Sequence, residues 1–155
     1  NDPRPGKEGR SGFQYLIPCL ATHDPIDIVV LMLGTNELKS TYSTTLEEIG
    51  EIIENKFVKT IKNFKSKITN KSLILILVAP PLINEFVDDI TKEIYKDATE
   101  KSKKFNEIYE KIAKENNCLF VSNDGLNPGI DGIHLTTESH RLLADKLYEK
   151  IVKTR

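Results

Sequence analysis

An aspartate and a histidine lie three residues apart in the stretch DGIHLTTESH, residues 131–140. A histidine that acts as a base needs a neutral imidazole with one ring nitrogen free. A carboxylate on the other ring nitrogen fixes that tautomer and stabilises the imidazolium once it forms. Asp131 and His134 are therefore candidates for activating a hydroxyl nucleophile. The alternative is a surface loop in which both side chains only cap nearby backbone groups.

A second candidate is Asn36, in the stretch LGTNELK. The amide of an asparagine that follows a strand is a suitable donor for a developing oxyanion. Gly34 would let the backbone turn sharply beside it, since glycine accepts conformations that other residues avoid. The alternative interpretation is a turn asparagine that bonds to its own loop.

The remaining histidines are weaker candidates for a catalytic or metal-binding role. His23 lies in ATHDP, where a helix end or turn is expected, and His140 falls in the first turns of the predicted last helix and is expected to face solvent. Neither has metal-ligand spacing with the other or with a cysteine, so we expect no metal site. The chain also contains no glycine-rich phosphate motif, which disfavours a nucleotide- or phosphate-binding domain. We expect no cofactor.

Three apolar runs predict the strands that would position these residues. Each is mainly apolar, and the first two are rich in β-branched side chains, as is typical of strands buried on both faces of a parallel sheet. The runs are IDIVVLML at 26–33, SLILILVAP at 72–80 and CLFVS at 118–122. Open parallel sheets place their sites at the carboxyl ends of the strands. The loops that qualify here are GTNELKS, PPLINEF and NDGLNPGIDGIH.

Helical patterns alternate with these runs. GFQYLIPCLATH predicts a short helix limited by Pro18. A capping box formed by Thr44 or Thr45 with Glu47 or Glu48 begins an amphipathic helix. Its apolar positions are Leu46, Ile49, Ile53, Phe57, Ile61, Phe64 and Ile68. A further helix covers about 95–116, with Phe105, Ile108, Ile112 and Ala113 inward, and a last one covers about 137–152, with Leu143, Leu147 and Ile151 on one face. Helical crossovers between buried strands predict an α/β fold with a parallel sheet.

Composition limits the class of protein. The chain has 155 residues and a net charge of −1. That length suits one domain. Residues 1–11 are expected to be a loop or linker. No basic stripe stands out, so nucleic acid is not an expected partner. No apolar run is long enough to cross a membrane. Cys19 and Cys118 make no disulfide framework and are expected to be buried and reduced, in a cytoplasmic protein.

Together, the loops resemble a known family. VVLMLGTNELKS resembles the third conserved block of the SGNH hydrolases, the GDSL esterase family, and DGIHLT is similar to the fifth block. The stretch from Gly12 to Lys39 is closer to the arylesterase and acyltransferase branch, related to carbohydrate acetyl esterases, which also has a segment similar to VAPPLI.

The resemblance implies a flavodoxin-like, three-layer α/β/α fold with His134 as general base, Asp131 as its orienting acid and Asn36 as an oxyanion donor. It also implies short-chain acyl, aryl or sugar acetate esters as substrates, and a homo-oligomer. Glu37 stands where family members commonly have aspartate.

The family's nucleophile is missing from this sequence. It lies in a Gly-Asp-Ser block after the family's first strand, and a second block supplies an oxyanion glycine, but neither block is present. Ser11 lacks a preceding strand, Ser40 and Ser43 are expected to be loop or cap residues, and Cys19 is expected to be a helix-buried thiol with little thiolate character.

We therefore expect an upstream segment to supply the nucleophile. Residues 1–155 would then be a single incomplete domain without its N-terminal strand or strands, and inactive by itself. The run at 26–33 would form an open apolar edge. The alternative is a non-catalytic, truncated module of the same fold that binds a ligand or a partner.

Overall fold

The computed structural model describes residues 11–154, so most of the predicted N-terminal loop lies outside it. Its sheet is parallel, in the order β1-β2-β3. The strands are β1 Ile28–Leu31, β2 Ile74–Val78 and β3 Leu119–Val121. Each is shorter than the apolar run that predicted it, because β1 pairs with β2 only from Ile28 to Leu31 and β3 pairs with β2 over three residues. The predicted parallel α/β sheet is confirmed.

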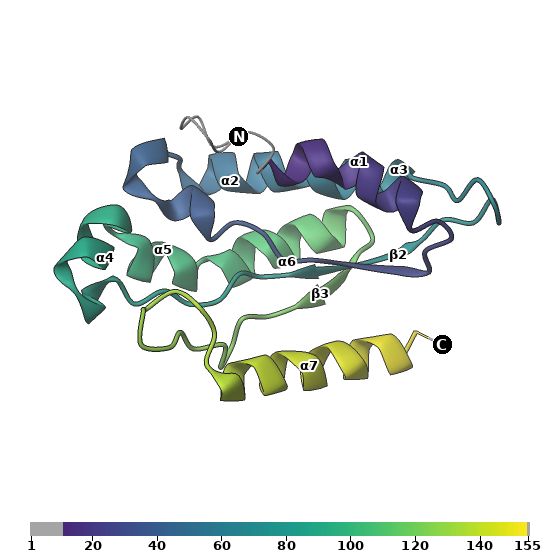
Figure 1. Cartoon of the computed structure of the whole chain (residues 1–155). Helices are drawn as coiled ribbons and strands as arrows, with labels where there is room; N and C mark the ends of the chain where they lie inside the picture. Colours follow the sequence, from purple (N-terminus) through teal and green to yellow (C-terminus); the bar gives the residue numbers. More distant parts are fainter. Residues whose placement is uncertain (1–10, 155) are drawn as a thin grey trace.

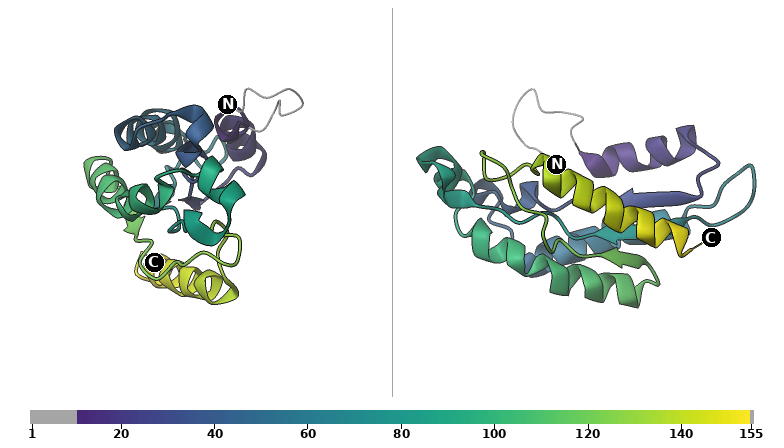
Figure 2. Two further views of the ribbon diagram at one scale, coloured as in Figure 1. Left: turned by 90° about the vertical axis from the view of Figure 1, so that its left-hand side faces the viewer. Right: turned by 90° about the horizontal axis from the view of Figure 1, so that it is seen from below.

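Helices cover both faces of this sheet (Figures 1 and 2). The α-helices are α1 Gly12–Thr22, α2 Leu46–Ile52, α3 Lys59–Asn63, α4 Asp89–Ile94, α5 Ala98–Lys103, α6 Phe105–Glu115 and α7 Thr137–Val152. A π-helical turn, η3 Ile53–Val58, joins α2 to α3, and three short 3-10 turns follow strands: η1 Asn36–Leu38, η2 Ser40–Tyr42 and η4 Glu85–Val87.

The core has two parts, one on each face of the sheet. On one face, Leu31, Leu75 and Leu77 pack with the helices from α1 to α6 in a large buried cluster. On the other face, Ile76, Val78 and Val121 pack against α7, through Leu143, Leu147 and Ile151. The predicted apolar face of the last helix is therefore confirmed, and the helix–sheet–helix arrangement has the three layers expected.

The amphipathic helix after β1 ends earlier than predicted. Thr45 and Glu48 form the capping box that begins it. It ends at Asn63, and Phe64 is already extended. Beyond it, the Ser66 side chain accepts hydrogen bonds from the backbone of Ile68 and Thr69 and closes a turn. Ile68, predicted to face the core, is 70% exposed, so that prediction is wrong.

Two other helix predictions need correction. The helix predicted at 95–116 is broken at Lys104 into α5 and α6, and α5 begins after Asp97, whose φ is 64°. The separate helix α4, capped by the Asp88 side chain, was not predicted. Pro18 lies inside α1 without ending it, and the Thr22 hydroxyl donates to the Pro18 carbonyl at 2.9 Å in the last turn.

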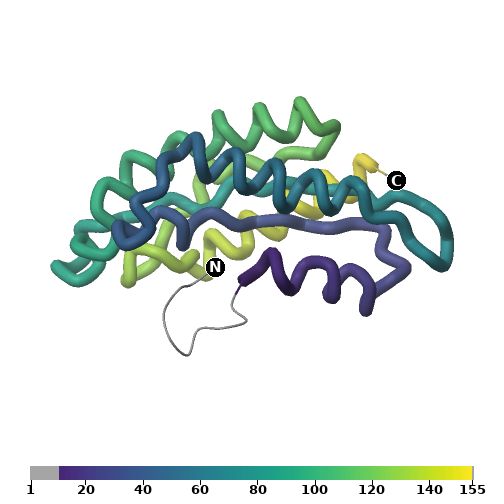
Figure 3. Tube along the Cα trace, turned by 90° about the horizontal axis from the view of Figure 1, so that it is seen from above, coloured from purple at the N-terminus to yellow at the C-terminus, as the bar shows by residue number. Residues whose placement is uncertain are grey.

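The β1 edge of the sheet carries exposed apolar side chains. Within residues 11–154, β1 pairs with β2 alone, and Val30, Met32 and Leu33 are exposed. Helix α1 runs alongside β1 (Figure 3), and of its own residues it buries little more than Leu20. A strand edge of this kind leaves backbone groups free to pair with another strand.

Both cysteines are free, but they are only half-buried, whereas full burial was predicted. Burial raises the pKa of the Cys118 thiol, although the nearby Lys62 opposes this. In the part of the chain that the structure describes, no helix has the length and apolar character needed to span a membrane.

Candidate active site

The Asp131 and His134 side chains form one compact unit after β3. Asp131 Oδ2 lies 2.5 Å from His134 Nδ1, a hydrogen-bonding distance. The His134 side chain is 85% exposed and that of Asp131 46% exposed. With Nδ1 engaged by the carboxylate, Nε2 is the nitrogen left to exchange a proton with a reacting group. The structure thus brings together the two residues that the spacing had singled out, and their catalytic roles stay a prediction.

Backbone bonds fix the carboxylate in this orientation. Asp131 Oδ1 accepts hydrogen bonds from the backbone N–H groups of Ile133 and His134, both at 3.0 Å. The bond with the His134 side chain, followed by these two backbone bonds, lowers the pKa of Asp131 to about 2. Because hydrogen bonds to the charged form favour it, Asp131 stays ionised at every pH where an esterase is ordinarily assayed.

We expect the carboxyl carbon of Asp131 to titrate in an NMR experiment with a midpoint near 2. In His134→Ala the midpoint should move upward, because the largest cause of the depression is gone. Since the folded pKa lies below the unfolded value, ionisation of Asp131 contributes to stability above about pH 4. That contribution is lost as the pH falls toward 2. An unchanged midpoint in the variant would contradict the assigned contact.

The residue that follows Asp131 must be glycine. Gly132 has φ +73°, and a Cβ there would lie 2.1 Å from the Asn84 carbonyl oxygen and 3.0 Å from Val87 Cγ2. The Asn84 N–H donates to the Gly132 carbonyl at 2.8 Å. The turn that holds Asp131 and His134 is therefore seated directly against the loop that follows β2.

Replacing Gly132 by alanine should destabilise the protein by about 1–3 kcal/mol, from the left-handed backbone conformation alone. The clash with Asn84 adds to this and displaces the turn. Urea unfolding measures the loss. Gly12→Ala is the matched control, since a Cβ at Gly12 would meet Leu33 at 3.6 Å, an ordinary contact. Equal stability of the two variants would count against the close approach.

Asn36 begins the η1 turn after β1 and is exposed. Its side chain forms no hydrogen bond with another residue of the range 11–154, so the alternative of an asparagine bonded to its own loop is not observed there. The preceding Gly34 has φ +131°, and a Cβ on it would lie 2.4 Å from the Tyr109 hydroxyl. That hydroxyl donates to the Leu33 carbonyl at 2.5 Å. Tyr109, from α6, thus supports the turn that presents Asn36.

Tyr95, at the end of α4, lies against the loop that carries Asn36. Its ring is buried, and Lys39 Nζ lies 5.8 Å from the ring centroid. Burial raises the pKa of Tyr95, and nearby acidic groups, including Asp131 and Glu37, raise it further. Both loops follow the carboxyl ends of parallel strands, so they lie at the same end of the sheet.

Sequence reasoning missed Tyr95, Tyr109 and Gly132 as supports of this site. For Tyr109 a signal was available, because it follows the inward Phe105 by one helical turn. Gly132 lies within the motif itself. Tyr95 gave no local signal, since it ends a short helix that had not been predicted.

The other serine and histidine candidates lie where structural roles were expected. Ser11 caps α1 and accepts from the Gln14 N–H, and the Ser40 hydroxyl donates to the Glu93 carbonyl. Ser43 ends η2. His23 ends α1 with Nδ1 3.0 Å from the Cys19 carbonyl, and His140 is exposed on α7. Over residues 11–154, no group of three His, Cys, Asp or Glu side chains could hold a metal ion.

Known proteins match this architecture. The model of the GDSL-like lipase/acylhydrolase family matches residues 14–147. A carbohydrate acetylesterase from Sinorhizobium meliloti, Est24, is 29% identical with a TM-score of 0.89, and the match covers 98% of this chain and 72% of that one. The native aryl esterase of M. smegmatis is 26% identical with a TM-score of 0.84, covering 92% and 68%. The comparison with curated proteins gives no match.

Because the family model spans most of the chain, the protein belongs to the GDSL-like lipase/acylhydrolase family. The high structural similarity to two esterases confirms the predicted SGNH-type α/β fold and its branch of arylesterases and carbohydrate acetylesterases.

Proposed function

We propose that this chain supplies the general base, its orienting acid and one oxyanion donor of a serine esterase. The observation that carries the proposal is the 2.5 Å contact between Asp131 Oδ2 and His134 Nδ1, at the end of the sheet where Asn36 is presented. Membership of the acylhydrolase family supports ester hydrolysis as the reaction class.

In this mechanism a serine hydroxyl attacks the ester carbonyl carbon while His134 Nε2 takes its proton. The negative charge that develops on the carbonyl oxygen is stabilised by the Asn36 amide. The tetrahedral intermediate collapses, the alcohol leaves with the proton from His134, and an acyl-serine remains. Water, deprotonated by His134, then attacks the acyl carbon. The carboxylic acid is released, and His134 returns the proton to the serine oxygen. Asp131 stabilises the imidazolium in both halves of the reaction.

The nucleophilic serine comes, in this proposal, from a segment outside residues 1–155. No Gly-Asp-Ser occurs in the sequence, and Ser11, Ser40 and Ser43 are engaged in caps and turns. The exposed apolar side chains of Val30, Met32 and Leu33 on the β1 edge suit a further parallel strand from that segment. Burying them would contribute roughly 25 cal/mol per Å² of apolar area.

The proposed substrates are small esters with short acyl chains and an aryl or carbohydrate alcohol. The support is the similarity to the structures of an aryl esterase and a carbohydrate acetylesterase. Hydrolysis of p-nitrophenyl acetate, p-nitrophenyl octanoate and an acetylated xylo-oligosaccharide tests this. We expect turnover of the acetates well above that of the octanoate. Faster octanoate hydrolysis would contradict the short-chain assignment.

The second candidate is a non-catalytic binding or interaction module of the same fold, and the absence of Gly-Asp-Ser favours it. Such a module has no need of a carboxylate aligned on a histidine, which favours the esterase.

We further propose that the protein is a homo-oligomer in the cytoplasm and that neither a membrane nor nucleic acid is its partner. Sedimentation velocity would contradict the oligomer if only a monomer were found.

A further inference from the structure

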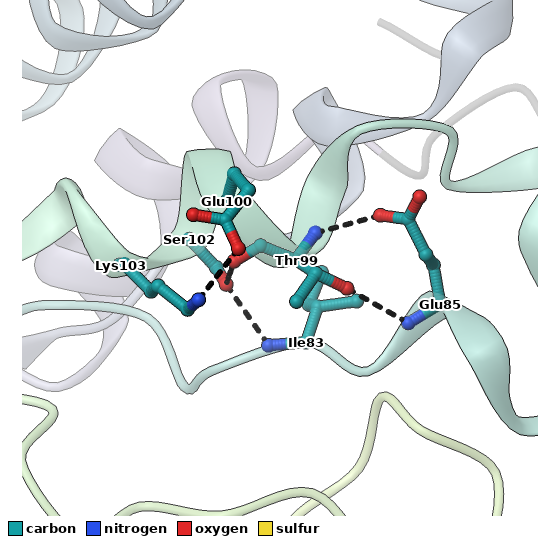
Figure 4. Close-up of polar contacts among 6 residues, drawn as sticks. All are labelled: Ile83, Glu85, Thr99, Glu100, Ser102 and Lys103. Carbon is teal, nitrogen blue, oxygen red and sulfur yellow. Dashed lines mark hydrogen bonds and ion pairs between the residues drawn. The ribbon is translucent and has the colours of Figure 1, made fainter.

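The segment that follows β2, from Pro80 to Glu85, is hydrogen-bonded to helix α5 on one side. The Ile83 N–H donates to the Ser102 hydroxyl at 3.0 Å, and the Glu85 N–H donates to the Thr99 hydroxyl at 3.1 Å. The buried Glu85 carboxylate accepts from the Thr99 N–H at 2.8 Å, as Figure 4 shows. This side of the segment is therefore fixed by Thr99 and Ser102 of α5.

The intervening residues bond to the loop that follows β3, which carries Asp131 and His134. The Leu82 N–H donates to the Leu126 carbonyl at 3.3 Å, and the Asn84 N–H donates to the Gly132 carbonyl at 2.8 Å. Successive N–H groups from Leu82 to Glu85 therefore alternate between the loop and α5. The segment acts as a brace between the helix and the catalytic turn.

The buried anchor of this brace is Asn123, which begins the loop. The residue is 1% exposed, and its Nδ2 donates to the Pro80 carbonyl at 2.7 Å and to the Ser102 carbonyl at 3.3 Å. Its backbone N–H donates to Asn106 Oδ1 at 2.8 Å. One side chain thus joins the ends of β2 and β3 and helix α5. Removing a buried donor leaves its acceptors unsatisfied, which is costly.

We propose that Asn123 is a positioning residue, setting where His134 stands relative to Asn36; this rests on the proposed esterase function. The bonds of Asp131 to His134 all lie within one turn, so they orient the imidazole relative to its acid but do not place that turn on the sheet. Placement depends on the bonds between the loops after β2 and β3. Asn123 supplies the most buried of them, and a shift of about 1 Å can lower a rate roughly 100-fold.

The test compares Asn123→Ala with Ser66→Ala in the protein that contains its nucleophile-bearing segment. Ser66 is the matched control, because it is also buried and its side chain also bonds to backbone groups, here by accepting from the Ile68 and Thr69 N–H groups. It lies in the turn before β2, at the opposite end of the sheet. We expect Asn123→Ala to lower kcat about 10- to 100-fold with little change in KM, and Ser66→Ala to leave kcat unchanged. The shape of the pH profile should be kept, since the Asp131–His134 contact remains.

Amide hydrogen exchange gives a readout that needs no catalysis. In Asn123→Ala, exchange at Leu82 and Asn84 should become faster than in Ser66→Ala, while exchange at Ile83 and Glu85, bonded to α5, should not. If Asn123→Ala does not fold, Asn123→Ser is used with the same criteria.

Normal kcat in a folded Asn123 variant, or an equal loss of kcat in Ser66→Ala, would overturn the positioning role. Unchanged amide hydrogen exchange at Leu82 and Asn84 in that variant would also overturn the positioning role. Failure of the wild-type protein to hydrolyse any ester would instead count against the proposed function, so the two failures are distinguishable.

Discussion

Replacing His134 by alanine is expected to lower kcat/KM for p-nitrophenyl acetate roughly 1,000-fold or more. The variant retains Asn36 and the nucleophile but has no group to take the serine proton, and the acyl-serine has no base to activate water. The unit of His134 and Asp131 is exposed and closed by local bonds, so the fold should not change. Steady-state kinetics and a circular dichroism melt measure the two effects.

His140→Ala serves as the control, because His140 is an exposed histidine on α7. Its kcat/KM should stay within about twofold of wild type, as expected of a surface substitution without special contacts. A His134→Ala enzyme that keeps most of its activity would show that another base serves the reaction, and the role given to Asp131 would fail with it.

Replacing Asn36 by alanine is expected to lower kcat about 100- to 1,000-fold, the usual effect of losing one oxyanion donor. KM should change little, because the amide bonds most strongly to the charge that develops in the transition state. Stability should also change little, since the Asn36 side chain bonds to no other residue of the described range. Stopped-flow measurement of the acylation step locates the loss.

The control for this variant is Asn63→Ala, an exposed asparagine at the end of α3. Activity near that of wild type is expected there. If Asn36→Ala raised KM without lowering kcat, Asn36 would bind the ground state of the substrate and the oxyanion role would be wrong.

Strong local patterns made the fold predictable. The three mainly apolar runs predicted the strands, and the spacing of Leu143, Leu147 and Ile151 predicted the buried face of α7. The errors fall where a local polar bond ends a pattern that hydrophobic spacing alone would continue. The Ser66 turn ends the helical spacing before Ile68, and the Asp88 side chain begins α4 within a stretch with no clear periodicity.

The site was predictable to the extent that its parts are close in sequence. Asp131 and His134 are three residues apart and meet within one turn, so their spacing was sufficient. Asn123 bonds to Pro80 and Ser102, and Tyr109 bonds to Leu33, across long separations in the chain. Contacts of this kind depend on how the strands and helices are packed, and a single sequence does not encode them in a local signal.

We propose that His134 and Asp131 serve a serine that residues 1–155 do not contain. Labelling of the active protein with a fluorophosphonate, followed by intact-mass and peptide mass spectrometry, tests it most directly. We predict one phosphonyl group, on a serine outside these 155 residues, and greatly slowed labelling in His134→Ala. Labelling of a serine within them, such as Ser11 or Ser40, or esterase activity that the reagent leaves untouched, would contradict the account.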